Sequence, residues 1–326
     1  MKRKYAITAA IGLGALSLGA ITYLSVITDI ISGRRKDHLE HPGKKISESK
    51  QKLIDASLKI KALPMTLVTM KNRSGMQLFG HWYPYEGAER TVILVHGWHG
   101  AWHQDFSGIA PFLHDAKCNL LLIEQRCHNS SDGKLISYGI LERYDVEDWV
   151  SYTRENLSAL PLYLYGMSMG ASTVLMASVL PGCADVKGII SDCGFTSPHE
   201  IISLTVKRRV GRELPITLAA VGKLCHLRAN FRYKDYSTVD ALKQNTNIPM
   251  LFIHGDEDDF VPCEMTYQNY LACAAPKEIL IVKGANHGRC CVVDAEAYQK
   301  KVLDFIKACD KRTICDIPID DIAVSE

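Results

Sequence analysis

The chain lacks a strong excess of charge of either sign. Its 326 residues carry 38 Lys and Arg against 36 Asp and Glu, a formal net charge of +2 at pH 7. Proteins that bind nucleic acid usually carry a marked basic excess. This balance therefore points neither to nucleic acid nor to an acidic partner. Internal repeats and low-complexity segments are also absent, which excludes repeat architectures.

Cysteines are present, but they lack the spacing of a metal site. The count of 11 is odd, so at least one thiol is unpaired. No Cys-x-x-Cys pair occurs, and Cys290 and Cys291 are adjacent to each other shortly after His287. We interpret most of the cysteines as small buried hydrophobic residues, which suits a reducing environment. The sequence implies neither a metal nor an organic cofactor.

Long uncharged runs are rare, and the exception lies near the N-terminus. After a basic start at residues 2–4, Tyr5–Thr28 contains 24 residues without a formal charge. As a helix it would reach roughly 36 Å, enough to cross a hydrocarbon core of about 30 Å. A cleaved signal peptide has a shorter apolar core and a small-x-small cleavage site, which the end of this run does not offer.

We therefore predict an N-terminal membrane anchor over residues 1–32, which places the protein at the cell membrane. Basic residues lie on both sides of the run, at positions 2–4 and again between 34 and 45. The positive-inside rule thus pulls in both directions. If the N-terminal cluster decides the orientation, the rest of the chain lies outside the cytoplasmic membrane, and we favour that arrangement.

The rest of the chain alternates predicted strands with predicted helices. Residues 33–60 read as a polar stalk or first helix, 61–311 as the main domain and 312–326 as a tail. The expected strands are Met65–Met70, Gln77–Tyr83, Thr91–Val95, Asn119–Glu124, Leu162–Tyr165, Val186–Asp192, Met250–His254 and Glu278–Val282. The expected helices are Asp105–Ala116, Glu142–Asn156, Ser168–Leu180, Glu264–Ala274 and Asp294–Cys309. Such alternation predicts an α/β fold with a mostly parallel, doubly wound sheet of about eight strands.

One interval breaks this rhythm. More than 50 residues separate Asp192 from Ile248 without a predicted strand, and they read as two or three helices rich in Lys and Arg. An ordinary connection would be much shorter. We predict a helical cap at about residues 197–245, inserted over the carboxyl ends of the strands.

The stretch from Leu162 to Ser178 carries the first chemical signal. An apolar strand pattern gives way to a helical one across Gly166-Met167-Ser168-Met169-Gly170. A serine at such a strand–turn–helix is exposed and held still, and glycines allow the close packing on either side. The N–H of Met169 would then face a developing oxyanion.

Further candidate groups follow other strands at the same expected edge of the sheet. His96-Gly97-Trp98-His99-Gly100 offers the Trp98 N–H as a second oxyanion donor. The segment "HGDEDDFVP" holds four acids at positions 256–259, and His287 lies in the loop after the last predicted strand. Asp192, at the end of another strand, competes with these four as the acid that orients the histidine.

These motifs resemble the α/β-hydrolase superfamily, over about residues 60–310. More narrowly, they resemble membrane-anchored α/β-hydrolases of Gram-positive bacteria, near the serine-aminopeptidase and carboxylesterase branch. In the family pattern the acid is the third residue after His-Gly, which selects Asp258. The family loop Asp-x-Arg-Gly-His-Gly-x-Ser has a counterpart at residues 124–131, where Cys127 and Asn129 replace the two glycines.

The resemblance implies a serine hydrolase acting on esters or related acyl compounds. Ser168 would be the nucleophile, His287 the base and Asp258 the acid, with Trp98 and Met169 donating to the oxyanion. An amidase or aminopeptidase with the same triad, and a membrane-tethered binding protein without activity, are the alternatives. The expected partners are a small acyl substrate and, through the N-terminal helix, the membrane. Since all five residues lie at or beyond position 98, deletion of residues 1–32 is expected to leave the chemistry intact.

Overall fold

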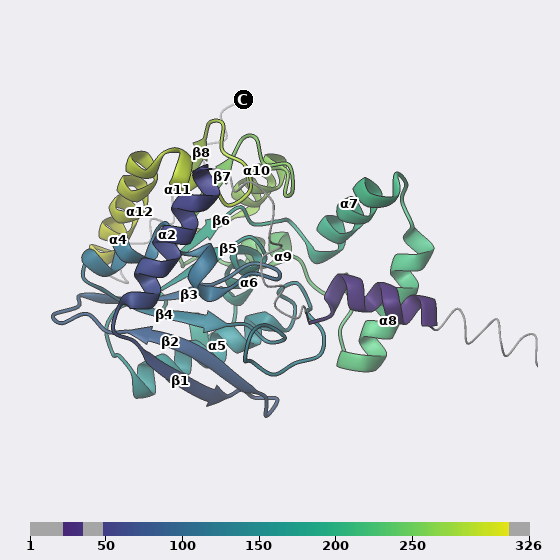
Figure 1. Ribbon diagram of the computed structural model, residues 1–326, viewed down its shortest axis with the longest axis horizontal. Coiled ribbons are helices and arrows are strands. Elements are labelled where there is room, and N and C mark those ends of the chain that lie inside the picture. The colour runs from purple at the N-terminus through teal and green to yellow at the C-terminus, as the bar shows by residue number, and fades with distance from the viewer. Residues whose placement is uncertain (1–21, 35–47, 313–326) are drawn as a thin grey trace, which may run out of the picture.

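The computed structural model describes residues 22–34 and 48–312. An eight-stranded sheet in the order β1-β2-β4-β3-β5-β6-β7-β8 forms its centre (Figure 1). β1 and β2 pair antiparallel with their neighbours, and the other strands run parallel. The predicted mostly parallel sheet is therefore confirmed. Its strands are Thr66–Lys71, Gln77–Tyr83, Arg90–Val95, Cys118–Glu124, Leu162–Met167, Gly188–Asp192, Met250–Gly255 and Lys277–Val282 for β1 to β8.

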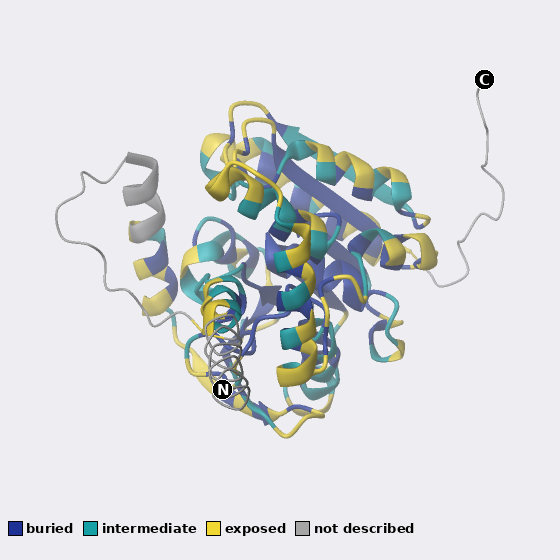
Figure 2. Cartoon of the chain, turned by 90° about the vertical axis from the view of Figure 1, so that its right-hand side faces the viewer, coloured by how far each residue is buried: buried dark blue, intermediate teal, exposed yellow. Residues whose placement is uncertain are grey.

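Helices cover both faces of this sheet, as the alternation of the strand residues requires. In β3, Val92 and Leu94 pack toward one helix layer, whereas Ile93 and Val95 pack toward the other. Strands β3 to β7 are wholly buried, whereas the edge strands β1 and β8 are partly exposed (Figure 2). The first layer contains α2 (Glu48–Ala62), α4 (Ala110–Asp115), α11 (Cys290–Val293) and α12 (Ala295–Asp310). The second contains α5 (Glu142–Asn156), α6 (Met169–Ala177), α9 (Thr238–Gln244) and α10 (Cys263–Ala272).

Several predicted elements differ by a few residues in their bounds, and two of these differences have a clear local cause. The helix expected over Asp105–Ala116 is split into α3 (Trp102–Asp105) and α4, because Pro111 near the start of α4 favours a new helix beginning there. The strand expected from Val186 begins at Gly188, since Val186 instead donates its N–H to Cys183 in the turn after the short 3-10 helix η1 (Pro181–Cys183).

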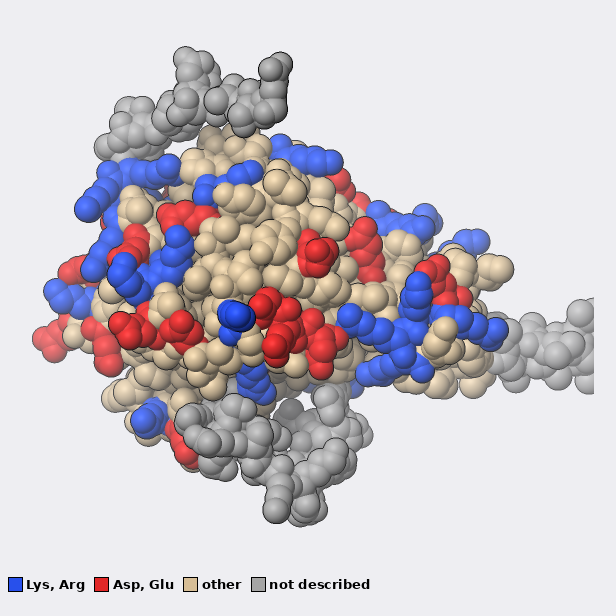
Figure 3. All heavy atoms as spheres, turned by 90° about the horizontal axis from the view of Figure 1, so that it is seen from above, with Lys and Arg blue, Asp and Glu red and all other residues tan. Residues whose placement is uncertain are grey.

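Two helices between β6 and β7 stand apart from the layers, at one end of the molecule (Figure 1). These are α7 (Pro198–Val210) and α8 (Pro215–Ala229), which we call the cap. Ser197 caps α7 by accepting the Glu200 N–H, and Gly211 ends it with a φ of 76°. Lys and Arg gather over this end of the molecule (Figure 3), and the exposed ones include Lys207, Arg208, Arg209 and Arg212.

The N-terminal part of the described chain lies against the cap. Residues 22–32 are helical and run beside α8 (Figure 1). No helix among the residues described here is long and apolar enough to cross a membrane. They therefore lend no support to the predicted transmembrane helix, of which residues 5–21 lie outside the described residues. The ten described cysteines are all free, and most are buried.

Candidate active site

A sharp turn between β5 and α6 exposes Ser168. Its backbone has a φ of 55° and a ψ of −118°, a conformation that non-glycine residues rarely adopt. A Cβ at Gly166 would lie 2.2 Å from the Gly170 carbonyl oxygen, and one at Gly170 would lie 1.8 Å from the Val95 carbonyl oxygen. Both flanking positions must therefore be glycine, and the turn is built as a nucleophile elbow requires.

Three of the candidate residues meet in one hydrogen-bonded line. Ser168 Oγ lies 2.9 Å from His287 Nε2, and His287 Nδ1 lies 2.7 Å from Asp258 Oδ2. The three residues follow β5, β8 and β7, at the carboxyl ends of parallel strands. Because a carboxylate can only accept, His287 Nδ1 carries the hydrogen and Nε2 is free to accept the Ser168 proton.

The Asp258 carboxylate is fully enclosed and fully hydrogen-bonded. Oδ1 accepts the Phe260 and Val261 N–H groups at 2.8 and 2.9 Å, and Oδ2 also lies 3.1 Å from His254 Nε2. Burial would raise the pKa of Asp258, but the hydrogen bonds from His254 and His287 outweigh it and hold this pKa well below its usual value. Sequence reasoning assigned no role to His254, although it stands in the motif that selected Asp258.

The competing acids do not reach the histidine. Asp192 Oδ2 accepts from Tyr298 OH at 2.5 Å, and burial raises the pKa of Asp192 to about 6. Asp256 accepts the Gly284 N–H at 2.6 Å, and Asp259 is exposed. Among the described carboxylates of this loop and of β6, Asp258 is thus the one bonded to His287.

The backbone N–H groups of Trp98 and Met169 are the two predicted oxyanion donors. Neither the Trp98 nor the Met169 N–H donates to an acceptor within the described ranges 22–34 and 48–312. The loop that carries Trp98 is held on both sides, since Gly97 N–H donates to Asp105 Oδ2 at 2.7 Å and His99 N–H donates to His128 Nε2 at 3.0 Å. Burial raises the pKa of Asp105 and lowers that of His128.

Sequence reasoning missed Asp105 and His128 as supports of this loop. Asp105 looked like the start of a helix, and a single acid eight residues after Gly97 has no distinctive pattern. His128 was visible only as a member of the loop at residues 124–131. Their contacts depend on how the loops after β3 and β4 meet in space.

Comparison with known proteins identifies the fold. Residues 90–212 match the family described as alpha/beta hydrolase fold. The chain has the α/β-hydrolase fold. It is 27% identical over 244 residues to the uncharacterized protein YqkD of Bacillus subtilis, which covers 74% of this chain and 79% of YqkD. It is 22% identical over 231 residues to the uncharacterized protein YfhR of Escherichia coli, which covers 68% of this chain and 72% of YfhR.

Solved structures show the same fold. The Pyrococcus furiosus esterase Pf2001 superposes with a TM-score of 0.63 at 20% identity, over 85% of this chain and 98% of that one. Est1E from Butyrivibrio proteoclasticus, solved with bound ferulic acid, superposes with a TM-score of 0.58 at 17% identity. That match covers 74% of this chain and 99% of Est1E.

The loop after β4 has positive φ values at the two positions where the family pattern has glycine. In this α/β-hydrolase-fold chain, Cys127 has a φ of 65° and Asn129 a φ of 43°. Glycine adopts such values freely, which explains why the family pattern places it there. The departure noted in the sequence therefore places two side chains at positions whose positive φ strains them.

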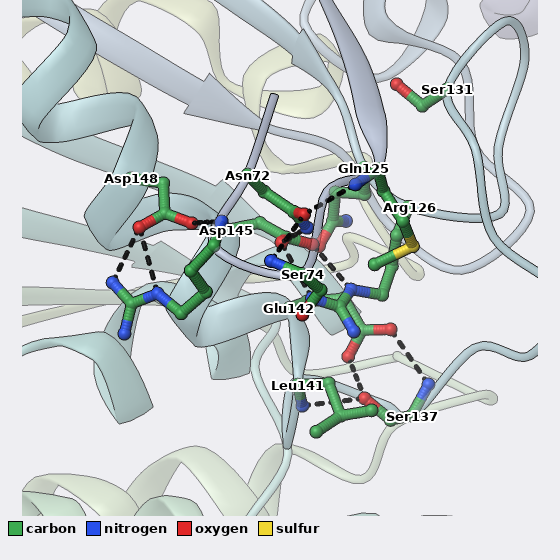
Figure 4. Close-up of polar contacts among 12 residues, drawn as sticks. Asn72, Ser74, Gln125, Arg126, Ser131, Ser137, Leu141, Glu142, Asp145 and Asp148 are labelled. Carbon is green, nitrogen blue, oxygen red and sulfur yellow. Dashed lines mark hydrogen bonds and ion pairs between the residues drawn. The ribbon is translucent and has the colours of Figure 1, made fainter. Parts of the chain in front are cut away.

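A buried ion pair fixes the same loop to α5 (Figure 4). Arg126 binds both oxygens of Asp145, at 2.5 Å from Nε and 2.7 Å from a terminal nitrogen. Asn72 donates to Asp145 at 2.6 Å, and Glu142 accepts the Ser137 and Gly139 N–H groups. This network holds the segment from β4 to α5, which forms part of the pocket wall.

The hydrolase fold encloses a small pocket above Ser168. Its cavity volume is about 20 Å³, which is room for about one water molecule. Apart from Ser168 and Thr205, the lining is apolar or aromatic: Trp98, Tyr138, Met169, Phe195, Ile201 and Phe260. The pocket combines one nucleophile with an apolar surface and contains no charged side chain in its lining.

Cys193 lies beside the triad but is poorly suited to hold a metal. Its sulfur and the nearest atoms of Asp258 and His287 lie within 4.8 Å of one another. Burial raises the pKa of the Cys193 thiol well above its usual value, so the sulfur keeps its proton. Asp258 and His287 are already committed to each other.

Proposed function

We propose that the protein is a serine hydrolase that cleaves an ester or a related acyl bond. The observation that carries the proposal is the line from Ser168 through His287 to Asp258, with hydrogen bonds of 2.9 and 2.7 Å. The α/β-hydrolase fold and its esterase neighbours support the hydrolase class. The triad roles and the substrate class are our inference from the geometry.

In the first half of the reaction, Ser168 Oγ attacks the carbonyl carbon while its proton passes to His287 Nε2. The carbonyl oxygen becomes an oxyanion within reach of the Trp98 and Met169 N–H groups. Asp258 stabilises the imidazolium that forms on His287. The leaving alcohol then takes the proton from Nε2, and the acyl group stays on Ser168.

Water completes the reaction by the same route. His287 Nε2 takes a proton from the water as its oxygen attacks the acyl carbon, and returns that proton to Ser168 Oγ when the acid leaves. No group other than the side chains and N–H groups already described is needed for this balance.

The pocket favours an ester with an apolar acyl group over an amide of an amino acid. A site that reads a free amine is expected to present a carboxylate, and the pocket lining has none. A non-catalytic role would leave the strained backbone of Ser168 without a purpose.

We also propose that the part of the uncharged run Tyr5–Thr28 that precedes residue 22 attaches the chain to the membrane, with the catalytic domain on the outer side. The support is the uncharged run in the sequence. Resistance of the full chain to carbonate extraction, and its digestion by protease added to intact cells, are the expected results. Release by carbonate would contradict the attachment.

A fluorophosphonate probe tests the catalytic assignment. We expect the full-length protein to be labelled once per chain and to hydrolyse p-nitrophenyl esters faster than aminoacyl anilides. Ser168→Ala should abolish labelling and lower kcat by about 10⁴- to 10⁶-fold. Ser151→Ala, on α5 away from the site, is the matched control. Stoichiometric labelling of Ser168→Ala would show that another residue is the nucleophile.

A further inference from the structure

Residues 22–34 lie far from the catalytic loops in the sequence, but in the structure they pack against the cap. Ser32 Oγ and Tyr233 OH lie 2.8 Å apart, and both residues are buried. Arg228 of α8 donates to Ser25 Oγ at 3.0 Å and pairs with Asp29 at 3.4 Å. Apolar side chains on the same side of the helix pack against the cluster beneath the cap, namely Leu24, Ile27 and Ile31.

The last turn of this helix is bound by residues of the active site. Trp98 Nε1 and Tyr138 OH both donate to the Ile31 carbonyl oxygen, at 3.2 and 2.8 Å. His99 Nε2 donates to the Gly33 carbonyl oxygen at 3.1 Å. Carbonyls at the end of a helix have no partner within the helix. Here the oxyanion loop and the pocket wall supply the donors.

The same segment holds the chain that leads into the pocket wall. Gly33 and Leu135 form a β-bridge, and Ile136 N–H donates to the Ser32 carbonyl oxygen at 2.6 Å. Arg34 donates to the Asn129 carbonyl oxygen at 2.8 Å. Residues 32–34 therefore brace the loop that follows β4 shortly before it reaches Tyr138.

Aromatic contacts link residues 22–34, through Trp98 and Phe260, to the base His287. The Trp98 and Phe260 rings are nearly parallel, with centroids 6.5 Å apart, and Phe260 meets His287 edge-on at 5.1 Å. A displacement of Trp98 would move both its own N–H and the ring that packs on His287. The segment thus borders the oxyanion donor directly and the base through one intervening ring.

We propose that residues 22–34 are a positioning element of the active site, which holds the oxyanion loop and the pocket wall through the Ile31 and Gly33 carbonyls. This inference rests on the proposed function, since it concerns how the same site is kept in register. It reverses the expectation that residues 1–32 are dispensable for the chemistry. The proposal therefore links the attachment of the N-terminus to the arrangement of the oxyanion loop and the pocket wall.

The test places one charge on either side of the helix in the full-length protein. Ile27→Asp puts a carboxylate into the contact with the cap, whereas Ile30→Asp puts it on the outer side, where Ile30 is 52% exposed. Both positions lie at nearly the same level along the helix, so any effect on membrane attachment is shared. The matched pair isolates the docking of the helix.

We expect Ile27→Asp to lower kcat for a p-nitrophenyl ester by about 100-fold, the scale of a lost oxyanion donor. The affinity for an alkyl trifluoromethyl ketone, whose adduct carries an oxyanion, should fall in parallel, and Ile27→Leu should restore both. Ile30→Asp should stay within about threefold of the wild type. Normal kcat and normal inhibitor affinity in Ile27→Asp with the helix detached would overturn the proposal.

A second measurement reports on the loop independently of activity. The chain has four tryptophans, so ¹⁹F NMR of protein labelled with 5-fluorotryptophan should show four signals, and Trp98→Phe assigns one of them. In Ile27→Asp we expect the Trp98 signal to shift or broaden while the other three stay in place. An unchanged Trp98 signal refutes the brace, and loss of dispersion in all four would mean unfolding.

Two further variants keep the proposal testable if Ile27→Asp unfolds. Trp98→Phe and Tyr138→Phe remove the two donors to the Ile31 carbonyl and keep an aromatic ring at each position. Their combination should lower kcat and inhibitor affinity by about tenfold or more; unchanged values of both would refute the brace. Absence of probe labelling in the wild type, by contrast, would refute the proposed function and leave the NMR result to decide on the brace.

Discussion

Replacing the Asp258 carboxylate by an amide should disable the base. Oδ1 accepts two backbone N–H groups, and Oδ2 accepts from His287 and lies 3.1 Å from His254 Nε2. In Asp258→Asn one of these sides must receive an NH₂ group. The backbone N–H groups of Phe260 and Val261 are fixed donors, so the amide oxygen stays beside them. The NH₂ group of the amide therefore faces His287.

His287 can then satisfy this NH₂ group only by accepting at Nδ1, which places its own hydrogen on Nε2. In that tautomer Nε2 no longer accepts the Ser168 proton. An equivalent change in a serine protease triad costs about 10⁴ in kcat, or about 5.4 kcal/mol of transition-state stabilisation. We expect a loss of that order here, with KM within a few-fold of the wild type.

The assay is hydrolysis of a short p-nitrophenyl ester, with fluorophosphonate labelling rates measured beside it. Asp192→Asn is the matched control, because Asp192 is buried at the end of β6 but bonds to Tyr298 and not to His287. It should retain activity within about tenfold. Thermal unfolding of both variants separates loss of activity from loss of structure. An inactive, folded Asp192→Asn beside an active Asp258→Asn would refute the assignment.

Three further outcomes concern stability. Asn129→Gly should raise the free energy of unfolding in urea by about 1 kcal/mol, because it removes side-chain strain at positive φ, and a decrease would show that the Asn129 side chain is needed. Arg126→Met should lower it by about 3–5 kcal/mol by leaving Asp145 buried and unpaired, and Arg126→Met with Asp145→Leu should recover most of the loss. Asp192 has a pKa raised by burial from 3.8 to about 6, so its stabilising effect is greatest below pH 4 and falls by about 3 kcal/mol as the pH rises through 6. Asp192→Asn should flatten that part of the stability–pH curve, and an unchanged curve would assign the effect to another group.

The parts of the fold that sequence predicts well are those decided within a few residues. Buried strands appear as continuous apolar runs, and the elbow appears as two glycines around Ser168, because close backbone approach admits no side chain there. The order Ser168, Asp258, His287 follows once each residue is placed after its strand. These signals are local, and the sheet brings them together.

The rest depends on contacts that leave no mark in residue identity. The Ile31 and Gly33 carbonyls bind the active-site loops, yet any residue would supply the same oxygen. Asp105 supports the Gly97 N–H from a position that reads as an ordinary helix start. Cys127 is a further example, because the loop holds it at a positive φ that a cysteine in the sequence would not predict.

The docking of residues 22–34 also sets an order of events during synthesis. Ser32 leaves the ribosome early, but Tyr233, its hydrogen-bond partner, follows 201 residues later. At about 5–20 residues per second, that gap lasts roughly 10 to 40 s. For this interval the helix lacks its partners in the cap and at Tyr233. The active site can be completed only after the cap has been synthesised, so the first segment made is among the last to find its place.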